Sequence, residues 1–510
     1  QQGTQELYTY NYWSSPVGFD DPNTLNNYEY TLNNNILKDG TNSSTPVNIT
    51  FVGGYDGSNG GSNIEIAHYW IWIFNNRLSD DYASWQHVRN TGTIEAGEGF
   101  TMKGVNDTGG NVSDEQNYVF QGKPNNGKVT LGIDGGNDYL VGNPYASAID
   151  AEQFITDNGP TIDGGVNPMI DDPLISGTLY FWEHWGGGSH VLAEYQGGYG
   201  TYNYSGGAPA AAFGNPDPDV AQVGTGTKTP GRYIPVGQGF FVVGESDGDI
   251  EFNNGQRVFQ KEGSSSSVFM RNSETASGTN NNEDTRMKIR LGFNSVNTIH
   301  RQLLVTVDDR ASENYDWGFD AKLNEDQIDD MYWMINDEKY TIQGTDVIYD
   351  YTVLPIGIHT DDDGLNSITI DILENVPSDL SIYVHDKELS VYQNLRERDY
   401  EIFLEAGEYL DRFEITFTAQ SLSVDEFDDV DTLQVFYVNS KGSIVIQNPK
   451  LVDLQSAEMF NMIGQSIAKF NEIETKNYLE LKTNQLSTGT YIINLKTTDG
   501  AVITKKVLVK

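Results

Sequence analysis

The segment NLKTTDGAVITKKVLVK (residues 494–510) closes the chain and alternates polar with β-branched or apolar side chains. A period of two is typical of a β-strand with one buried face. Strand character recurs at short spacing in KVTLGI (128–133), GFFVVG (239–244), MKIRLGF (287–293), RQLLVTVD (301–308) and DRFEITFT (411–418). The sequence therefore predicts an all-β fold of several β-sandwich domains in series.

Helical periodicity is scarce. Two short segments, DAEQFITDNG (150–159) and LNEDQIDDMYWMI (323–335), space their apolar residues as a helix does. We expect these two to be the best candidates for short helices.

The composition excludes several kinds of chemistry. The 510 residues include no Cys, which excludes disulfides and thiolate chemistry. No apolar run approaches the roughly 18 residues that span a bilayer, so no transmembrane segment is predicted. The chain opens QQGTQELYTYNYW, without the basic and apolar regions of a signal peptide, and we expect a processed or trimmed start.

Charge divides the chain into two parts. The formal net charge is -42, yet residues 432–510 hold nine Lys against six Asp and Glu, which makes this part +3 and the rest -45. The acidic balance argues against nucleic acid and against anionic membranes, because both need a basic footprint. The change of sign marks a module boundary.

Two low-complexity segments suggest the other boundaries. EGSSSSVFMRNSETASGTNNNEDTR (262–286) has the composition of an exposed loop or linker, and the acidic SLSVDEFDDVDTLQ (421–434) repels itself and stays extended. We predict a β-rich domain at 1–262, a second β-sandwich at 286–420, an acidic linker at 421–431 and a terminal domain at 432–510.

The first region contains an internal echo. GTIEAGEGFTMKG (92–104) resembles GRYIPVGQGFFVVG (231–244), and each places Gly–Glu/Gln–Gly–Phe at the start of a strand. This favours a repeated strand–turn–strand whose glycines supply positive-φ turns, with a ligand-binding loop as the alternative.

Few residues suggest metal or catalytic chemistry. EHWGGGSH (183–190) brings Glu183, His184 and His190 together, but the spacing is wrong for a zinc helix, and we interpret it as a packed aromatic loop. The sequence has no nucleophile elbow and no phosphate-binding loop, so we predict no catalytic residue and no enzyme.

A calcium site and a glycan site remain as hypotheses. Asp361, Asp362 and Asp363 precede a turn glycine and could bind calcium, the one cofactor that the sequence suggests. They lack the full calcium-loop pattern, so a solvated turn is the alternative. Tyr180, Trp182 and Trp185 lie in a Gly-rich aromatic stretch (180–207) and could stack on sugar rings. Core packing is the alternative there.

Four C-terminal motifs occur in a distinctive order. They are VNSKGSIVIQNP (438–449), SAEMFNMIGQSIAKF (456–470), LSTGTYIINLKTTDG (486–500) and ITKKVLVK (503–510). Together they resemble the type A C-terminal sorting domain of type IX secretion cargo, and the resemblance implies that the last domain is a small Ig-like sandwich of seven strands. The matching sorting-signal positions are Asn461, Gly464, Gln465, Gly489, Tyr491, Lys505 and Lys506.

The resemblance implies export in two steps, first to the periplasm and then through an outer-membrane translocon. It implies that residues 432–510 bind this translocon and its shuttle barrel, and that the product is secreted or displayed on the cell surface. Any cleavage point would lie in the acidic linker. The alternating last strand can also form a sheet edge that pairs with a receptor by strand addition.

The upstream region brings a weaker resemblance. YNYWSSPVG (10–18), YLVGNPYASAIDAEQFI (139–155) and GTLYFWEHW (177–185) resemble a β-rich stalk or adhesin-like region found before such sorting domains in large surface proteins. We therefore expect a non-catalytic, adhesin-like surface protein, with a surface glycan as a candidate ligand. The alternative is a secreted carbohydrate-binding or polysaccharide-degrading protein.

Overall fold

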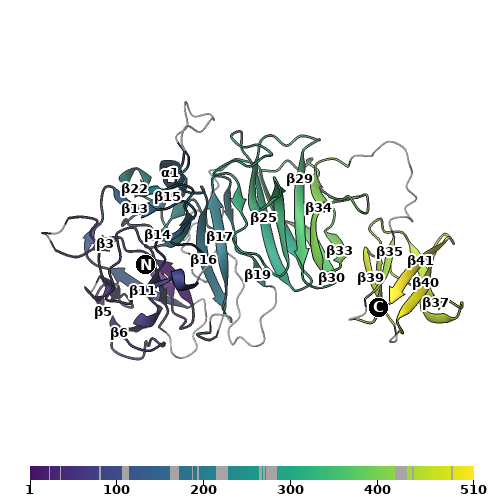
Figure 1. The fold of residues 1–510 in the computed structure, drawn as a ribbon, viewed down its shortest axis with the longest axis horizontal. Coiled ribbons are helices and arrows are strands. Elements are labelled where there is room, and N and C mark those ends of the chain that lie inside the picture. Colours follow the sequence, from purple (N-terminus) through teal and green to yellow (C-terminus); the bar gives the residue numbers. More distant parts are fainter. Residues whose placement is uncertain are drawn as a thin grey trace. The chain divides into compact units, whose positions relative to one another are not determined.

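The computed structural model describes residues 1–509 except 22, 24, 35, 80–81, 106–113, 161–171, 187, 192–194, 214–227, 263–266, 268–269, 271–283, 420–432, 439–440 and 484–485. The chain divides into two compact units (Figure 1). The N-terminal unit comprises Gln1–Ile289, His300–Glu325 and Glu338–Val347, and the C-terminal unit comprises Arg290–Ile299, Asp326–Asp337 and Ile348–Lys510. The predicted linker at 421–431 lies outside the described residues.

The all-β prediction is confirmed, and most strands are short. The strands up to residue 258 are β1 (Gln2–Thr4), β2 (Tyr10–Trp13), β3 (Val17–Gly18), β4 (Leu37–Asp39), β5 (Val47–Asn48), β6 (Thr50–Val52), β7 (Glu65–Ala67), β8 (Trp72–Ile73), β9 (Gln86–His87), β10 (Phe100–Lys103), β11 (Glu115–Phe120), β12 (Lys123–Pro124), β13 (Val129–Ile133), β14 (Asp138–Gly142), β15 (Ala148–Asp150), β16 (Leu179–Gly186), β17 (Gln196–Asn203), β18 (Gly206–Ala208), β19 (Ala212–Phe213), β20 (Tyr233–Ile234), β21 (Gly239–Val243), β22 (Gly248–Phe252) and β23 (Arg257–Val258). Short helices are η1 (Leu32–Asn34), η2 (His68–Trp70), η3 (Tyr82–Ser84), α1 (Ala151–Asp157) and η6 (Asn254–Gln256).

The later strands are longer. They are β24 (Lys288–Asn294), β25 (Ile299–Val307), β26 (Ala321–Lys322), β27 (Asp330–Ile335), β28 (Glu338–Thr345), β29 (Val353–Thr360), β30 (Gly364–Glu374), β31 (Tyr383–Asp386), β32 (Val391–Asn394), β33 (Tyr400–Leu404), β34 (Gly407–Thr416), β35 (Gln434–Val438), β36 (Ser443–Gln447), β37 (Leu454–Asn461), β38 (Ser466–Asn471), β39 (Tyr478–Lys482), β40 (Gly489–Thr497) and β41 (Val502–Val509).

The two echoing segments of the N-terminal unit fold alike. Gly97 and Gly237 both take the left-handed conformation, with φ of +86° and +75°, which glycine adopts without strain. The following polar residue is buried in both copies, Glu98 at 1% and Gln238 at 0% exposure. Each turn leads into a strand with a fully buried phenylalanine, β10 in the first copy and β21 in the second.

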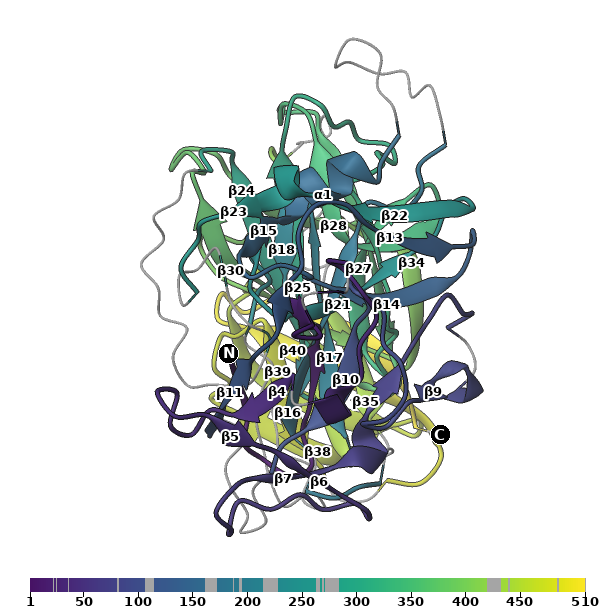
Figure 2. The ribbon, with the colours of Figure 1, turned by 90° about the vertical axis from the view of Figure 1, so that its left-hand side faces the viewer.

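Each copy also accepts a main-chain hydrogen bond from the strand region that pairs with the other copy. β10 pairs antiparallel with β2, and β21 pairs antiparallel with β14. The amide of Ser14, just after β2, donates to the Gly237 carbonyl of the other copy, and the Gly142 amide of β14 donates to the Gly97 carbonyl, both at 2.9 Å. Figure 2 shows β10, β14 and β21 near the middle of the view. The strand partner of each copy therefore hydrogen-bonds to the turn glycine of the other copy.

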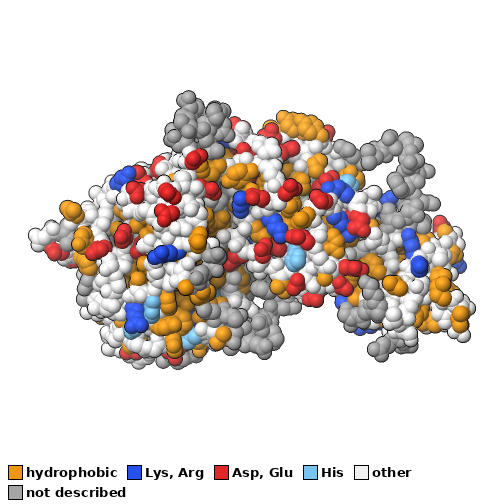
Figure 3. Space-filling model, in the orientation of Figure 1, with side chains coloured by type: hydrophobic (Ala, Val, Ile, Leu, Met, Phe, Trp, Pro, Cys, Tyr) orange, Lys and Arg blue, Asp and Glu red, His pale blue; other side chains and the backbone are white. Residues whose placement is uncertain are grey.

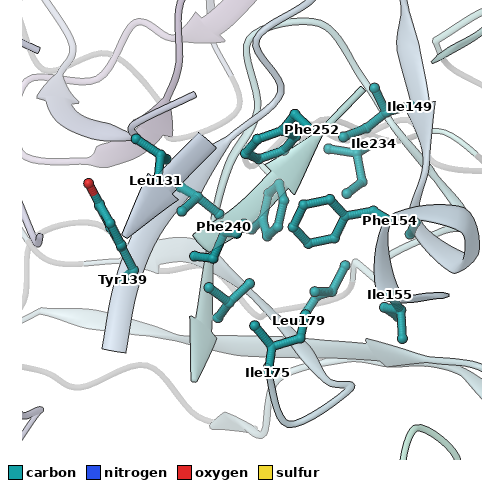
Figure 4. Packing of buried hydrophobic residues seen from close by; sticks show 14 of the residues in the cluster. Leu131, Tyr139, Ile149, Phe154, Ile155, Ile175, Leu179, Ile234, Phe240 and Phe252 are labelled. Carbon is teal, nitrogen blue, oxygen red and sulfur yellow. The ribbon is translucent and has the colours of Figure 1, made fainter. Parts of the chain in front are cut away.

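The main core of the N-terminal unit lies beside helix α1 (Figure 4). The Asp150 carboxylate caps this helix by accepting from the Glu152 amide at 3.1 Å. Phe154 then packs edge-on against Phe240, at 5.5 Å between ring centroids, and lies 4.8 Å from Phe252. The helix predicted at 150–159 is therefore present.

Two other expectations meet different outcomes. The helix predicted at 323–335 is wrong, because Asp330–Ile335 form strand β27, which pairs with β29. Trp333 and its neighbours are buried on both faces of this strand, and such a continuous apolar run imitates a helical pattern. The predicted linker at 262–286 lies mostly outside the described residues, but its Met270 is 1% exposed and belongs to the main core.

The C-terminal unit begins with long antiparallel strands. Strands β27, β29, β34, β31 and β32 pair in that order, and β30 pairs with β33. A buried ion pair joins β31 to β34, because the Arg412 guanidinium donates to both oxygens of the fully buried Asp386. The Tyr400 hydroxyl donates to the same carboxylate at 2.8 Å.

The last part of the chain is a two-sheet sandwich. One sheet has the order β35-β36-β39 and the other β38-β37-β40-β41. A separate core fills the space between them, with Ile444, Met459 and Ile493 all at 0% exposure. The expected seven-stranded sandwich is therefore present at the C-terminus.

Candidate functional site

The predicted sorting-signal residues of β37 and β38 form one hairpin turn. The Asn461 carboxamide oxygen accepts from the Ile463 amide at 3.2 Å and from the Gln465 amide at 2.9 Å. Its amide nitrogen donates to the Gln465 side chain at 3.0 Å. Gly464 has φ of +80°, a conformation that β-carbons oppose. The motif Asn–x–x–Gly–Gln thus specifies this turn.

The other sorting-signal residues lie on the neighbouring strands. Tyr491 of β40 stands opposite Asn461 in the sheet, and its hydroxyl donates to the Ser487 carbonyl at 2.9 Å. Gly489 lies on the same strand, and Lys505 and Lys506 lie on β41. Lys506 is exposed whereas its neighbour Lys505 is partly buried. The structure therefore brings the last three of the four motifs together on one sheet, while the first motif (438–449) contributes β36 to the other sheet.

The residues predicted to stack on sugars lie on β16, an inner strand of the five-stranded sheet β14-β21-β16-β17-β18. Trp185 is 0% and Tyr180 is 5% exposed, so protein atoms cover both rings and leave no free face for a ligand. Trp182 is partly exposed, and it stacks on Tyr12 with centroids 6.1 Å apart. Central position in the sheet explains this burial.

The three candidate calcium ligands lie in the turn between β29 and β30. Asp363 accepts from the Ala406 amide at 2.8 Å, and Asp361 lies 3.7 Å from the His359 ring nitrogen. Asp362 is exposed, as are its two neighbours. Within the described part of the chain, no three His, Cys, Asp or Glu side chains converge in a geometry suited to a metal.

A different set of residues forms an aromatic surface on the N-terminal unit. We call it the aromatic band, and it consists of Tyr8, Tyr55, Tyr69, Trp70, Trp72, His87 and His190. Along it, neighbouring ring centroids are 4.1–5.8 Å apart. Tyr55 is 55% exposed and Trp70 is 6% exposed, while the other five are partly exposed. In Figure 3, histidine and hydrophobic side chains lie side by side in the lower part of the N-terminal region.

Contacts between distant segments hold the band. Trp70, in η2, donates its indole N–H to the Tyr55 carbonyl at 2.7 Å and fixes the Gly-rich loop between β6 and β7. Trp72 and His87 form a cross-strand pair of β8 and β9, stacked at 4.1 Å with 13° between ring planes. The rings are therefore held in place by one another and by the main chain.

A buried lysine contacts the rings of the band from the protein interior. Lys103 is 3% exposed, and its side-chain nitrogen lies 3.7 Å from the Trp70 ring centroid and 4.7 Å from that of Tyr10. It hydrogen-bonds to the Tyr195 hydroxyl and, at 2.9 Å, to His190 Nδ1. Burial lowers the pKa of Lys103 to about 6, although nearby carboxylates oppose this shift.

The histidines of this region are neutral at pH 7. Burial lowers the pKa of His190, although its hydrogen bond to Asp56, 2.7 Å from Nε2, acts in the opposite direction. Burial and then Arg89 lower the pKa of His87. Burial also lowers the pKa of His184, in the core beneath, to about 3. The exposed ring faces of the band thus carry no charge.

A polar groove of about 560 Å³ lies elsewhere on the N-terminal unit. It is lined by Asn75, Asn76, Arg77, Leu78, Ser84, Asp134 and Asn137. Asn76 exchanges hydrogen bonds with Asp134 and accepts from Asn137 at 2.9 Å. Three of the residues that line the groove therefore hydrogen-bond to one another, and these bonds connect the loop between β8 and β9 to the turn after β13.

Comparison with known families assigns both parts of the chain. Residues 435–510 match the family described as secretion system C-terminal sorting domain. Residues 1–417 match a family described as a domain of unknown function, DUF8693. The chain belongs to the DUF8693 family.

The sorting-domain match confirms the resemblance on which export was predicted. This DUF8693 protein is cargo of the type IX secretion system, exported to the cell surface or secreted. Its sorting domain implies interaction with that machinery. In the described ranges, no helix of the DUF8693 protein is long and apolar enough to cross a membrane.

Other comparisons add little. No curated protein matches this chain. A solved structure described as "Biofilm associated protein - BSP domain" aligns with 10% identity over 100% of this chain and 98% of that one. Its TM-score of 0.15 is too low to support an argument about fold or function.

Sequence reasoning missed the aromatic band. Its signal is the cluster HYWIW (68–72), which follows a loop rich in glycine and carrying Tyr55. Tyr8 and His190 lie far from that cluster in sequence, so only the fold brings them to it.

Proposed function

We propose that this protein is a non-catalytic, adhesin-like binding protein that the type IX system displays on or releases from the cell surface. One observation carries the proposal, namely the aromatic band on a chain that is exported. Aromatic side chains supply large contact areas at low cost in conformational entropy, and for this reason they are enriched at binding surfaces. An exported chain that keeps such rings at its surface is suited to contact with an external ligand.

The environment of three acid–base groups supports a non-catalytic role. Lys103, His184 and Glu98 have shifted pKa values, but each is at most 3% exposed. Each is also hydrogen-bonded to protein groups, as when His184 contacts the Gly186 carbonyl at 2.6 Å. These groups stabilise buried polar contacts and do not face a substrate.

The test uses the purified full chain. Beads coated with it should adhere to cell or matrix surfaces, and the same preparation should release no product from a panel of polysaccharides and proteins. Turnover of any of these substrates would overturn the proposal, and so would a failure of coated beads to adhere above beads coated with albumin.

A further inference from the structure

The aromatic band has the chemistry of a carbohydrate-binding surface. We infer that it binds a neutral polysaccharide by stacking sugar rings on Tyr55, Tyr69 and Trp72. This inference rests on the proposed function and names the ligand class of the same surface.

The geometry supports stacking on several rings in succession. Tyr69 lies 4.8 Å from Tyr55 and 5.8 Å from Trp72, with ring planes at 81° and 82°. In such edge-to-face contacts each ring covers only part of its neighbour, and the rings keep area for a ligand because Tyr55 is 55% exposed and Tyr69 and Trp72 are partly exposed. A polymer can contact successive rings, and weak contacts at neighbouring sites then add.

The band is already rigid before any ligand arrives. The Trp70 indole ties down the loop of Tyr55, and the stacked His87 holds Trp72. Rings that need no reordering lose little entropy on binding, which favours a shallow site.

Polar groups beside the rings suit sugar hydroxyls. The Asp56 side chain is 68% exposed and uses one oxygen to hold His190. A carboxylate has more acceptor positions than this single bond occupies, so Asp56 can also accept from hydroxyl groups. An aromatic face with a carboxylate at its side matches the C–H face and the hydroxyl edge of a sugar ring.

The negative charge of the protein favours neutral polysaccharides over acidic ones as ligands. Asp56 is the acidic group bonded within the band, and residues 1–431, which include the band, carry a formal net charge of -45. Acidic polymers such as alginate or dextran sulfate are therefore repelled at long range. The neutral histidine rings add no positive charge to offset this repulsion.

Affinity electrophoresis of the full chain provides the test, with laminarin, starch, mannan and xylan as neutral probes and alginate and dextran sulfate as acidic ones. At least one neutral probe should retard the chain, and Tyr55→Ala combined with Tyr69→Ala should weaken that retardation about tenfold. Trp72→Phe keeps a ring and should retain most of the binding. Phe259→Ala removes a 101% exposed ring outside the band and should change nothing.

Each remaining outcome is decisive. Unaltered retardation of the double variant, equal losses in Phe259→Ala, or retardation by acidic probes alone would overturn the inference. Coated beads that adhere although no neutral probe binds would overturn the inference and leave the adhesin role standing. Circular dichroism and the melting temperature of each variant separate lost stacking from lost folding.

Discussion

Lys103 gives the sharpest test of how the band is supported. Its amine sits among Tyr10, Trp70 and Tyr195, and burial lowers its pKa from 10.5 to about 6. At pH 7 this amine is neutral in the folded chain and protonated in the unfolded chain. The difference lowers the free energy of unfolding by about 4–5 kcal/mol relative to a side chain that is neutral in both states. Replacement by methionine removes that cost and keeps apolar contact with the rings.

The substitution also loses two hydrogen bonds, those to His190 and Tyr195. Each is worth about 1 kcal/mol net. We therefore expect Lys103→Met to stabilise the N-terminal unit by roughly 2 kcal/mol at pH 7.

The dependence on pH identifies the cause. Because the folded pKa lies below the unfolded one, the unfolded chain binds more protons between about pH 6 and 10.5. The contribution of Lys103 to wild-type stability therefore rises with pH across this window, by up to about 1.4 kcal/mol per unit, and the advantage of Lys103→Met shrinks by about 2–3 kcal/mol from pH 7 to pH 9.

Urea denaturation of the full chain at pH 7, 8 and 9, followed by tryptophan fluorescence, measures this advantage. Lys128→Met is the matched control, because the Lys128 side chain is 61% exposed on the same unit. The effect of Lys128→Met should stay constant from pH 7 to pH 9. An equally constant advantage of Lys103→Met would refute the reasoning.

Four further outcomes are expected. Deleting residues 432–510 should trap the chain in the periplasm, and normal surface levels in cell fractionation would contradict the sorting role. Asp386→Ala leaves the Arg412 guanidinium without its buried partner and should cost about 3–5 kcal/mol in urea denaturation, whereas a loss below 1 would show the pair to be dispensable. Gly464→Ala forces a β-carbon into φ of +80° and should lower sandwich stability by about 1–2 kcal/mol, a cost that an unshifted unfolding curve would disprove. Chelator should leave the melting temperature unchanged if Asp361–Asp363 form a solvated turn, and a clear drop would restore the calcium hypothesis.

The sequence predicted the terminal sandwich well because its strands each bury one face. In β41, Ile503, Val507 and Val509 point inward, while Thr504 and Lys506 are exposed. An alternation of this kind is visible in the letters alone. The motif turn was also accessible, since Asn461 and its hydrogen-bond partners lie within five residues.

The same reasoning fails where both faces of a strand are covered. In β16 the apolar and aromatic residues run without alternation, so nothing in the sequence indicates that Trp185 is enclosed while Trp182 is partly exposed. The helix expected at 323–335 failed for the same reason, because β27 is buried on both sides. Burial on both faces removes the periodic signal on which such predictions depend.

The support of the band could not be predicted for a different reason. Lys103 meets His190 across 87 residues, and His190 meets Asp56 across 134. Lysine is rarely buried, so its type alone predicts exposure. Three segments that are distant in sequence bring these groups into contact: β10 carries Lys103, the loop between β6 and β7 carries Asp56, and the segment after β16 carries His190.

The local hydrogen-bond partners explain why one copy carries an acid where the other carries an amide. Glu98 is surrounded by donors, with the Asn75 side-chain nitrogen at 2.8 Å and the Tyr139 hydroxyl at 3.2 Å, and a carboxyl group offers two oxygens that can accept. Gln238 instead donates to two main-chain carbonyls and accepts from the Met270 amide at 2.7 Å, which requires both functions at once. The repeat therefore conserves the length and burial of this side chain, while the donors and acceptors around each copy decide its chemical type.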